Sequence, residues 1–443
     1  MILLCFGLFL AAVVGCLLCG YSLVWALLFG LVLFFCHGLQ KGFPVRDLLA
    51  MAWSKGRDSL IVVPVFLIIG MVMAMWRSSG TIAFFLYHGL KGISPGWFVL
   101  MAFLLSALLS YALGTSYGVT GTCGVILITL ARSGHVDLAI TAGAILSGAY
   151  FGDRCSPMSS CATLVAACTG TKLYANVREM LRTAALPTVL TIGIFAVLSL
   201  HNPISSVDNA VLSALSEHFS LHWATLLPAG IMLLLPLLKV PVKWAMAISA
   251  LCAFVLTVLL QGVPLGEALR AAILGYKPVQ TELQSILTGG GLVSMISTCL
   301  IVFITSLYAG ILEGIDALSS AHAWVEQLAR KIGLFPTSIV VSAILAAVFC
   351  NQSVAVLMDE QLLAESYRKR GASRTELAID ISNSGVMIAG LIPWSIAISV
   401  PLSMLDMGSE AIPWCVLLYL IPLCYLPTKR FFRPGQNVPS ERT

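Results

Sequence analysis

The sequence predicts an all-α polytopic membrane protein with about ten to twelve transmembrane segments, organised as two repeated halves. Three observations lead to this prediction. Hydrophobic residues make up 59% of the chain and charged residues only 10%, whereas about a quarter of the residues in a soluble domain are charged. Charge-free runs recur along the chain, several of them as long as the roughly 20 residues of a membrane-spanning helix. Finally, the same order of apolar runs and polar interruptions occurs twice.

The first apolar element covers residues 1–43, which we interpret as N-terminal transmembrane segments. Residues 1–40 hold no Lys, Arg, Asp or Glu. No basic stretch precedes the first apolar run, and the apolarity continues through "YSLVWALLFGLVLFFCHG". We therefore expect this segment to be retained rather than removed as a signal peptide.

The first repeat is predicted over residues 44–205. It opens with an amphipathic stretch and continues through long apolar spans with two interruptions. One lies near 111–121, where "LGTSYGVTGTCG" gathers Gly and hydroxyl side chains inside a charge-free run. The other lies near 152–160, in "GDRCSPMSS", where Pro157 stops the preceding helix. Each interruption predicts a broken or re-entrant helix.

Residues 206–263 are predicted to form connecting transmembrane segments, and residues 264–427 a second repeat. The second repeat runs through "PLGEALRAAILGY", "IGLFPTSIVVSAILAAVFCNQSVAV" and "TELAIDISNSGVMIAGLIPWS", in the order of the first. Broken helices are expected near 349–354 and 391–395. Interrupted segments at matching places in two halves are typical of secondary transporters built from structural repeats.

The charge distribution and the cysteines exclude other classes. The net charge of +5 is modest, and nothing in it indicates a nucleic-acid partner. The tail 428–443 and the loop "SYRKRGASR" are basic, so both are predicted to be cytoplasmic. The thirteen cysteines lie scattered in apolar runs, which indicates small buried side chains rather than disulfides or a metal site. No cofactor and no enzymatic motif is indicated.

Asp153 is the first candidate for proton or ion coupling. Broken backbone at membrane depth is tolerated where it lines an enclosed, wettable cavity, and helix ends there present partial charges to an ion. A carboxylate at such a place is neutralised by Arg154, by a bound cation or by a proton, and an Asp153–Arg154 ion pair is the simplest alternative. The candidate binding residues of the first half are Thr115, Ser116, Thr120, Ser156, Ser159, Ser160 and Thr163.

Asp380 is the second candidate for coupling, one turn into the helix "ELAIDISNSG". A polar ladder inside a membrane span indicates a functional site. By contrast, Asp359 and Glu360 precede the basic "YRKR" and are interpreted as a solvated helix end. The candidate binding residues of the second half are Asn351, Gln352, Ser353, Ser382, Asn383 and Ser384.

Four of these motifs together resemble a known family. "GTSYGVTGTCGV", "SGAYFGDRCSPMS", "SYRKRGASRTELA" and "SGVMIAGLIPWS" are similar to the NhaC-type sodium/proton antiporters of the ion transporter superfamily, over about residues 44 to 427. The resemblance implies two inverted repeats, a scaffold domain that forms a homodimer, and a mobile domain that moves by an elevator-like displacement. It also implies exchange of sodium for protons in a prokaryotic inner membrane. Other members carry organic acids or amino acids.

The sequence departs from the family pattern at several acids. After Asp153 the family carries a second Asp, two Thr and an Asn, where this chain has Ser160, Cys161, Ala162 and Thr163. In the second half two family acids are replaced by Ser382 and Asn383, while Asp380 stands where the family has an uncharged residue. Hard cations prefer carboxylate and carbonyl oxygens, so these losses weaken a bare sodium site. The remaining hydroxyls and amides suit a carboxylate-bearing solute instead.

The sequence therefore leaves two functions open. The first is an antiporter of Na⁺, or another monovalent cation, and H⁺, in which the only metal ion is the transported one. The alternative is an H⁺- or Na⁺-coupled transporter of a small organic acid or amino acid. Both predict an integral membrane protein in contact with lipid and with a small substrate.

Overall fold

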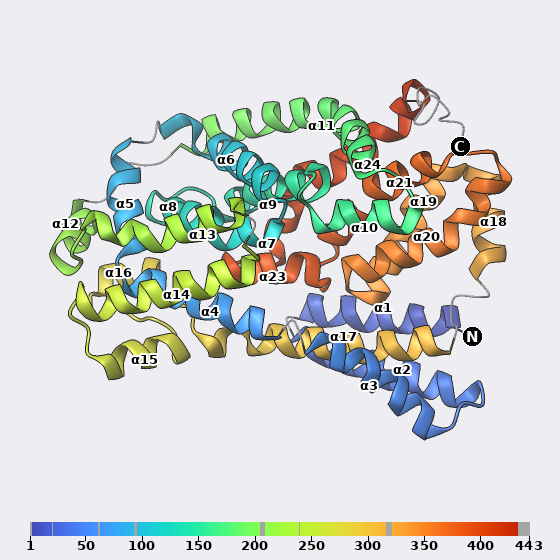
Figure 1. The fold of residues 1–443 in the computed structure, drawn as a ribbon, viewed down its shortest axis with the longest axis horizontal. Helices are drawn as coiled ribbons and strands as arrows, with labels where there is room; N and C mark the ends of the chain where they lie inside the picture. Colours follow the sequence, from blue (N-terminus) through green and yellow to red (C-terminus); the bar gives the residue numbers. More distant parts are fainter. Residues whose placement is uncertain are drawn as a thin grey trace.

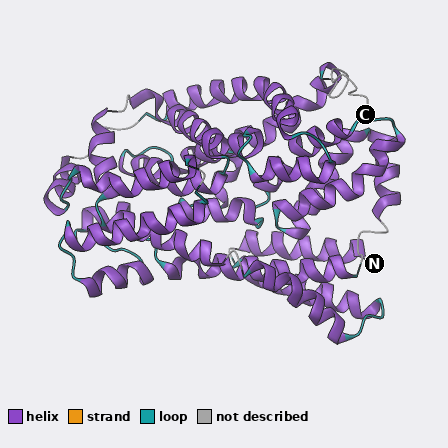
Figure 2. Cartoon of the chain, viewed as in Figure 1, coloured by secondary structure: helices purple, strands orange, loops and turns teal. Residues whose placement is uncertain are grey.

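The structure is a computed structural model that describes residues 2–19, 21–60, 63–92, 95–203, 209–238, 240–315 and 321–432. Figure 2 shows that the described chain is helical nearly throughout. Outside the helices, an isolated antiparallel bridge joins Tyr276 to Gly289. The described residues therefore form an all-α membrane protein, as predicted. Residues 433–443 of the predicted basic tail lie outside the described part.

The first half of the chain contributes the helices up to α11 (Figure 1). They are α1 (Ile2–Cys19), α2 (Leu23–Gln40), α3 (Val45–Ser59), α4 (Val63–Ser78), α5 (Thr81–Gly92), η1 (Pro95–Trp97), α6 (Phe98–Leu113), α7 (Ser116–Val119), the π-helix η2 (Thr120–Gly124), α8 (Val125–Ser133), α9 (Leu138–Cys155), α10 (Ser160–Thr169) and α11 (Leu173–His201).

The second half contributes the remaining helices. They are α12 (Asn209–His218), η3 (Trp223–Leu226), α13 (Leu227–Leu237), α14 (Val242–Leu259), α15 (Leu265–Leu274), α16 (Thr281–Leu287), η4 (Leu292–Met295), α17 (Ile296–Gly314), α18 (Ala321–Ile332), α19 (Leu334–Phe349), α20 (Gln352–Lys369), α21 (Arg374–Asn383), α22 (Gly385–Ile388), η5 (Ala389–Leu391), α23 (Ile396–Met404), η6 (Ser409–Trp414), α24 (Val416–Thr428) and η7 (Lys429–Phe431).

Within the described residues, three helical segments are long and apolar enough to cross a membrane: α2, α11 and the segment Leu292–Gly314. Two further spans appear if bent pairs are counted as one each, namely α4 with α5 and the segment Arg374–Leu391 with α23. Several shorter apolar helices, such as α6 and α19, end at breaks instead of continuing. Ten to twelve segments remains a prediction.

The amphipathic and leading helices of each half pack against a helix of the other half. Helices α2 and α3 lie against α17, whereas α14 and α15 lie against α4. Figure 1 shows these two groups side by side, with α1, α2, α3 and α17 in one and α4, α13, α14 and α15 in the other. The arrangement joins the two halves of the sequence into one bundle.

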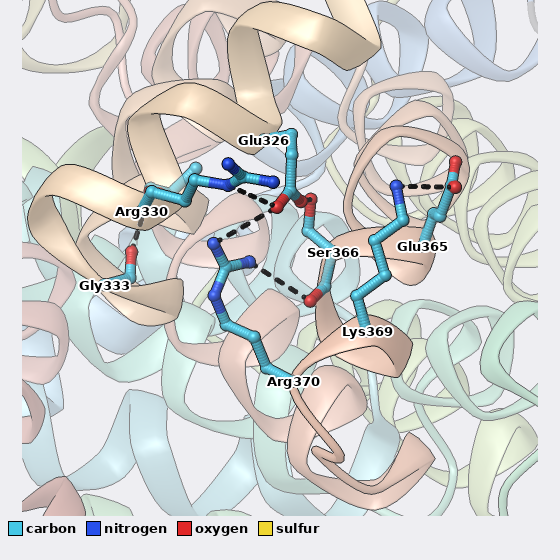
Figure 3. Close-up of polar contacts among 8 residues, drawn as sticks. Glu326, Arg330, Gly333, Glu365, Ser366, Lys369 and Arg370 are labelled. Atoms are coloured by element: carbon cyan, nitrogen blue, oxygen red, sulfur yellow. Dashed lines mark hydrogen bonds and ion pairs between the residues drawn. The ribbon is translucent and has the colours of Figure 1, made fainter.

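Helix α18 attaches to α20 through a polar network at one end of the molecule (Figure 3). Glu326 of α18 accepts hydrogen bonds from Ser366 at 2.9 Å and from Arg330 at 3.2 Å. Arg370, just after α20, reaches the same carboxylate at 3.4 Å. Because one carboxylate joins both helices, the polar face of the amphipathic α18 is fixed against α20.

Helices α6 and α9 pack closely because α9 carries glycines along the contact. A Cβ added at Gly152 would lie 2.0 Å from the backbone carbon of Ser110, and one added at Gly148 would lie 2.5 Å from the backbone oxygen of Phe103. These are contacts with backbone, which side-chain rotation cannot relieve. The close approach brings Asp153, the residue after Gly152, to the point where α6 ends.

We predict that Gly152→Ala destabilises the protein, because the new methyl group collides with the backbone of α6. Overpacking of this kind costs typically about 1–3 kcal/mol, and it should lower the thermal unfolding midpoint of the purified protein in detergent. The matched control is Gly193→Ala in α11, where an added Cβ meets nothing within 4 Å and where Ala favours the helix. Equal midpoints for the two variants would contradict the close packing.

Candidate functional site

The first break in the chain lies at Gly114 and Thr115, between α6 and α7. Gly114 ends α6 in the left-handed conformation, with φ 69°. Thr115 is extended, with φ −148° and ψ 124°, and its hydroxyl accepts a hydrogen bond from the amide of Gly118 at 3.3 Å. The capping hydroxyl starts a new helix at Ser116, so the break falls inside the expected range 111–121 but spans two residues.

The second half contains a break of the same geometry at Cys350 and Asn351. Cys350 ends α19 with φ 54°, and Asn351 is extended with φ −135° and ψ 119°. The Asn351 side-chain oxygen accepts from the amides of Ser353 at 3.0 Å and Val354 at 3.3 Å. A left-handed residue followed by a capping side chain therefore interrupts both halves at matching places.

Both breaks meet the first residues of α23. The amide of Ile396 donates to the backbone oxygen of Cys350 at 2.8 Å. The backbone oxygen of the same residue accepts from the Tyr117 hydroxyl, in α7, at 3.1 Å. Ile396 thus lies between the two breaks and joins them through its own backbone groups.

The segment between α9 and α10 forms a third break, at Ser156 to Ser159. Ser156 is extended, and its hydroxyl donates to the backbone oxygen of Tyr111 at 2.7 Å. Ser159 caps α10 by accepting from the amides of Cys161 and Ala162, and its hydroxyl donates to the backbone oxygen of Asp153. These two serines hold the unwound segment in place instead of projecting freely.

Asp153 lies in the last turn of α9 and is 6% exposed. Its Oδ2 accepts a hydrogen bond from the hydroxyl of Ser116, the first residue of α7, at 3.2 Å. A carboxylate at a helix N-terminus gains from the partial positive charge there. No Lys or Arg of the described residues forms an ion pair with it.

Arg154 turns away from Asp153 and joins three helices. Its side chain donates to the backbone oxygens of Met180 at 3.0 Å and Ser382 at 3.3 Å, and to the Thr183 hydroxyl at 2.8 Å. It also bonds the side-chain oxygen of Asn383. The simple ion pair between the two neighbours is therefore wrong, because carbonyl and amide oxygens of α11 and α21 occupy the guanidinium.

The polar side chains at the end of α21 contact two different groups, Arg154 and the serine hydroxyls of α19. Ser382 and Asn383 face Arg154. Ser384 instead contacts the hydroxyls of Ser338 at 2.7 Å and Ser342 at 3.1 Å, both in α19. Ser384 lies at the break between α21 and α22, and this chain of hydroxyls connects that break to α19.

Asp380 is fully buried and already has a basic partner. Its Oδ2 accepts from the Tyr367 hydroxyl at 2.5 Å and forms an ion pair with Lys429. Lys429 also binds Glu376 at 2.8 Å. The first basic residue of the tail is thus held against α21, and its ammonium group neutralises Asp380. The coupling role of Asp380 stays a prediction.

Several predicted residues lie at the edge of these contacts. Gln352 donates to the backbone oxygen of Val386 at 2.9 Å, and Thr120 bonds the backbone oxygen of Ser116 at 2.8 Å within its own helix. The side chains exposed at the start of α10 and α20 are those of Ser160, Thr163 and Ser353. The structure therefore brings Ser116 and Ser159 to Asp153, and leaves these three facing outward.

Asp359 is the buried acid that sequence reasoning missed. It is 0% exposed, so its interpretation as part of a solvated helix end is wrong. The signal was its position on α20, because Val356 and Leu363, three residues before and four after, are also buried and share its helix face. Glu360 falls on the neighbouring face and is partly exposed.

No group of three or more His, Cys, Asp or Glu side chains among the described residues has the arrangement of a metal site. Asp153 and Asp359, in the broken helices, each have one hydroxyl partner, from Ser116 and Ser342 respectively.

Comparison with known proteins identifies a family of antiporters. The model of the Na⁺/H⁺ antiporter family matches residues 1–162 and 148–428. An uncharacterised Na⁺/H⁺ antiporter of Haemophilus influenzae is 28% identical over 385 residues, covering 84% of this chain and 82% of the relative.

Two further relatives have more specific names. A malate-2H⁺/Na⁺-lactate antiporter of Bacillus subtilis is 28% identical and covers 81% of this chain and 78% of its own length. The Na⁺/H⁺ antiporter NhaC of Alkalihalophilus pseudofirmus is 25% identical, with 84% of each chain covered. Since the family model matches nearly the whole sequence, the chain belongs to the Na⁺/H⁺ antiporter family and is a transporter rather than an enzyme.

Proposed function

We propose that the chain exchanges Na⁺, or another monovalent cation, for H⁺ across a prokaryotic inner membrane, at a site formed around Asp153. One observation carries the proposal. Asp153 is buried at a helix break, its carboxylate is bonded by the Ser116 hydroxyl, and its basic neighbour is engaged elsewhere. An unpaired carboxylate in a low-dielectric site is costly, so a proton or a cation has to neutralise it.

The alternating character of transport is supported by the repeated breaks. Opposed helix ends at the two breaks present backbone dipoles to a substrate. The helices that carry the breaks contact the scaffold of α4 and α17 mainly through α23 and α19. We propose two inverted repeats in which the broken helices move as a unit past this scaffold, in the elevator manner.

The orientation proposal rests on the basic end of the molecule. Arg368, Lys369 and Arg370 lie at the end of α20, and Lys429 binds α21 at the same end. Helix α1, the first described helix, also begins on this side, at the right of Figure 1. Because cytoplasmic segments of membrane proteins carry an excess of Lys and Arg, we propose that this end, including the C-terminus, is cytoplasmic.

Exchange of a small organic acid or amino acid is the second candidate. It is favoured by the acid-poor breaks, where Ser160 and Asn383 replace acids of the family pattern and where helix N-termini attract carboxylates. The relative of Bacillus subtilis named as a malate-2H⁺/Na⁺-lactate antiporter supports the same reading. In this case Asp153 would carry the coupling proton, while the hydroxyls bind the solute.

We predict that Asp153→Asn abolishes gradient-driven exchange while the folded protein remains in the membrane. The amide keeps the size of the carboxyl group but cannot titrate or bind a cation by charge. The measurement is proton flux in proteoliposomes after a Na⁺ gradient is imposed. Asp137→Asn is the matched control, because Asp137 caps the opposite end of α9 by accepting from the Ile140 amide at 3.0 Å, and Asn caps a helix equally well. Undiminished pH-dependent flux in Asp153→Asn would remove Asp153 from the mechanism.

We predict that Ser160→Asp distinguishes the two substrate classes by the sign of its effect. Ser160 is the exposed first residue of α10, so the new carboxylate adds negative charge beside that helix N-terminus. At a few ångströms in a partly wetted site the effect on affinity is about tenfold or more. Na⁺ should bind more tightly if the cation is the substrate, and a carboxylate solute should bind more weakly if it is the substrate.

The measurement for Ser160→Asp is calorimetric titration of the purified protein with Na⁺, Li⁺ and a panel of carboxylates. Ser216→Asp, on the exposed surface of α12, controls for net charge. If the affinities of the Ser160→Asp protein equal those of the control in both titrations, Ser160 lies outside the binding site.

A further inference from the structure

Three fully or almost fully buried carboxyl groups lie in the helices that carry the breaks, and they differ in what neutralises them. Asp380 has the Lys429 ammonium group as its partner. Asp153 is the group to which we assign exchange. Asp359 remains without a role, although it is the most completely enclosed of the unpaired acids at 0% exposure.

The immediate surroundings of Asp359 hold one hydrogen-bond donor. Its Oδ2 accepts from the hydroxyl of Ser342, in α19, at 2.7 Å. Its Oδ1 is buried and has no hydrogen-bond partner among the described residues. An ionised carboxylate so placed would lack most of the compensation that burial requires. A proton or a cation is therefore needed to neutralise this carboxyl group.

The oxygen atoms around Asp359 suit a small cation. The Ser342 hydroxyl lies 3.1 Å from that of Ser384, at the break that begins α22. The backbone of Gly385 lies against the same group, because a Cβ added there would be 2.3 Å from Asp359 Oδ2 and 3.3 Å from the Ser342 hydroxyl. Hard cations take carboxylate, carbonyl and hydroxyl oxygens as ligands. A single negative charge is balanced by one monovalent cation or by one proton.

The charged groups on the elements packed around α20 are engaged elsewhere or lie at its ends. On α21, Asp380 is paired with Lys429, as is Glu376. On α18, Glu326 is held by Arg330 and Arg370. The other titratable groups on these elements are Arg374 on α21, His322 and Lys331 on α18, Cys161 and Cys168 on α10, and Glu360, Glu365, Tyr367, Arg368 and Lys369 on α20 itself. Helix α19 carries no charged side chain. No described group forms an ion pair with Asp359.

A cavity of about 520 Å³ opens beside this position at the basic end of the molecule. Its lining includes Glu360, the residue after Asp359, together with Thr169 of α10 and Leu377 of α21. Asp359 itself is fully buried and is not part of this lining.

We propose that Asp359, with the Ser342 and Ser384 hydroxyls, is a second monovalent-cation site of the transporter. The inference rests on the proposed cation/proton exchange and adds a site to it. In the exchange the O–H bond of the Asp359 carboxyl breaks, the proton passes to water, and one cation such as Na⁺ binds the carboxylate. Charge is conserved at the site, because one positive charge leaves as another arrives. The full cycle then moves two cations against two protons, through Asp153 and Asp359.

The experiment counts protons released when the purified protein is saturated with Na⁺ in weakly buffered detergent solution, alongside equilibrium binding of radioactive Na⁺. The wild-type protein should release two protons and bind two Na⁺. Asp359→Asn should release one and bind one, because the amide retains the volume but neither titrates nor carries charge. Glu365→Gln is the matched control on the same helix, since Glu365 is half exposed and paired with Lys369 at 2.9 Å. It should behave as the wild type.

Ser342→Ala is a second variant that keeps the carboxyl group. Loss of one hydroxyl ligand should weaken Na⁺ binding at this site about tenfold, which corresponds to about 1.4 kcal/mol, and two protons should still be released. Two protons and two Na⁺ in Asp359→Asn would overturn the second site, as would a single Na⁺ in the wild type. A wild-type protein that binds no Na⁺ and releases no proton would instead contradict the proposed function itself.

Discussion

A membrane-buried backbone has to satisfy its own hydrogen-bonding groups, and the rest of this structure follows from how it does so at three of its interruptions. At two of them a left-handed residue, Gly114 or Cys350, ends a helix and the next side chain caps a new one. At the third, the Ser159 hydroxyl caps α10. Because each cap restores bonding within a few residues, helix ends can remain in the interior without unfolding. The polar chemistry of the protein is concentrated at these ends.

Arg154 connects helices of the two halves next to these breaks. A buried guanidinium needs several oxygen partners, and here they come from α11 and from the second-half helix α21. The same bonds remove the nearest positive charge from Asp153. The Arg154 side chain thus joins the two halves. It also leaves the Asp153 carboxylate to be neutralised by an exchangeable proton or cation. The family relation to Na⁺/H⁺ antiporters agrees with such a site.

Patterns in the sequence predicted the helical class, the places of the breaks and the position of Asp153, because hydropathy, Gly, Pro and hydroxyl content act locally. Which groups each buried charged side chain contacts could not be predicted in the same way. The direction of Arg154 depends on oxygens of α21, more than 200 residues away in the chain. The Lys429 contact of Asp380 and the burial of Asp359 likewise come from packing between distant helices. The basic residues that follow Asp359 suggested that its side chain is exposed to solvent. These basic residues lie a full turn or more further along α20, so they do not expose Asp359.

The packing of each half's leading helices against the other half has a consequence for biosynthesis. Helix α4 emerges from the ribosome early, yet the helices that cover it, α14 and α15, are made nearly 200 residues later. At roughly 5–20 residues per second this delay lasts about 10–40 seconds. During that time α4, which carries the buried Arg77, lacks its final partners in the bilayer. The first half therefore depends on lipid or on the insertion machinery until the second half arrives, and a truncated chain would be a substrate for quality-control proteolysis.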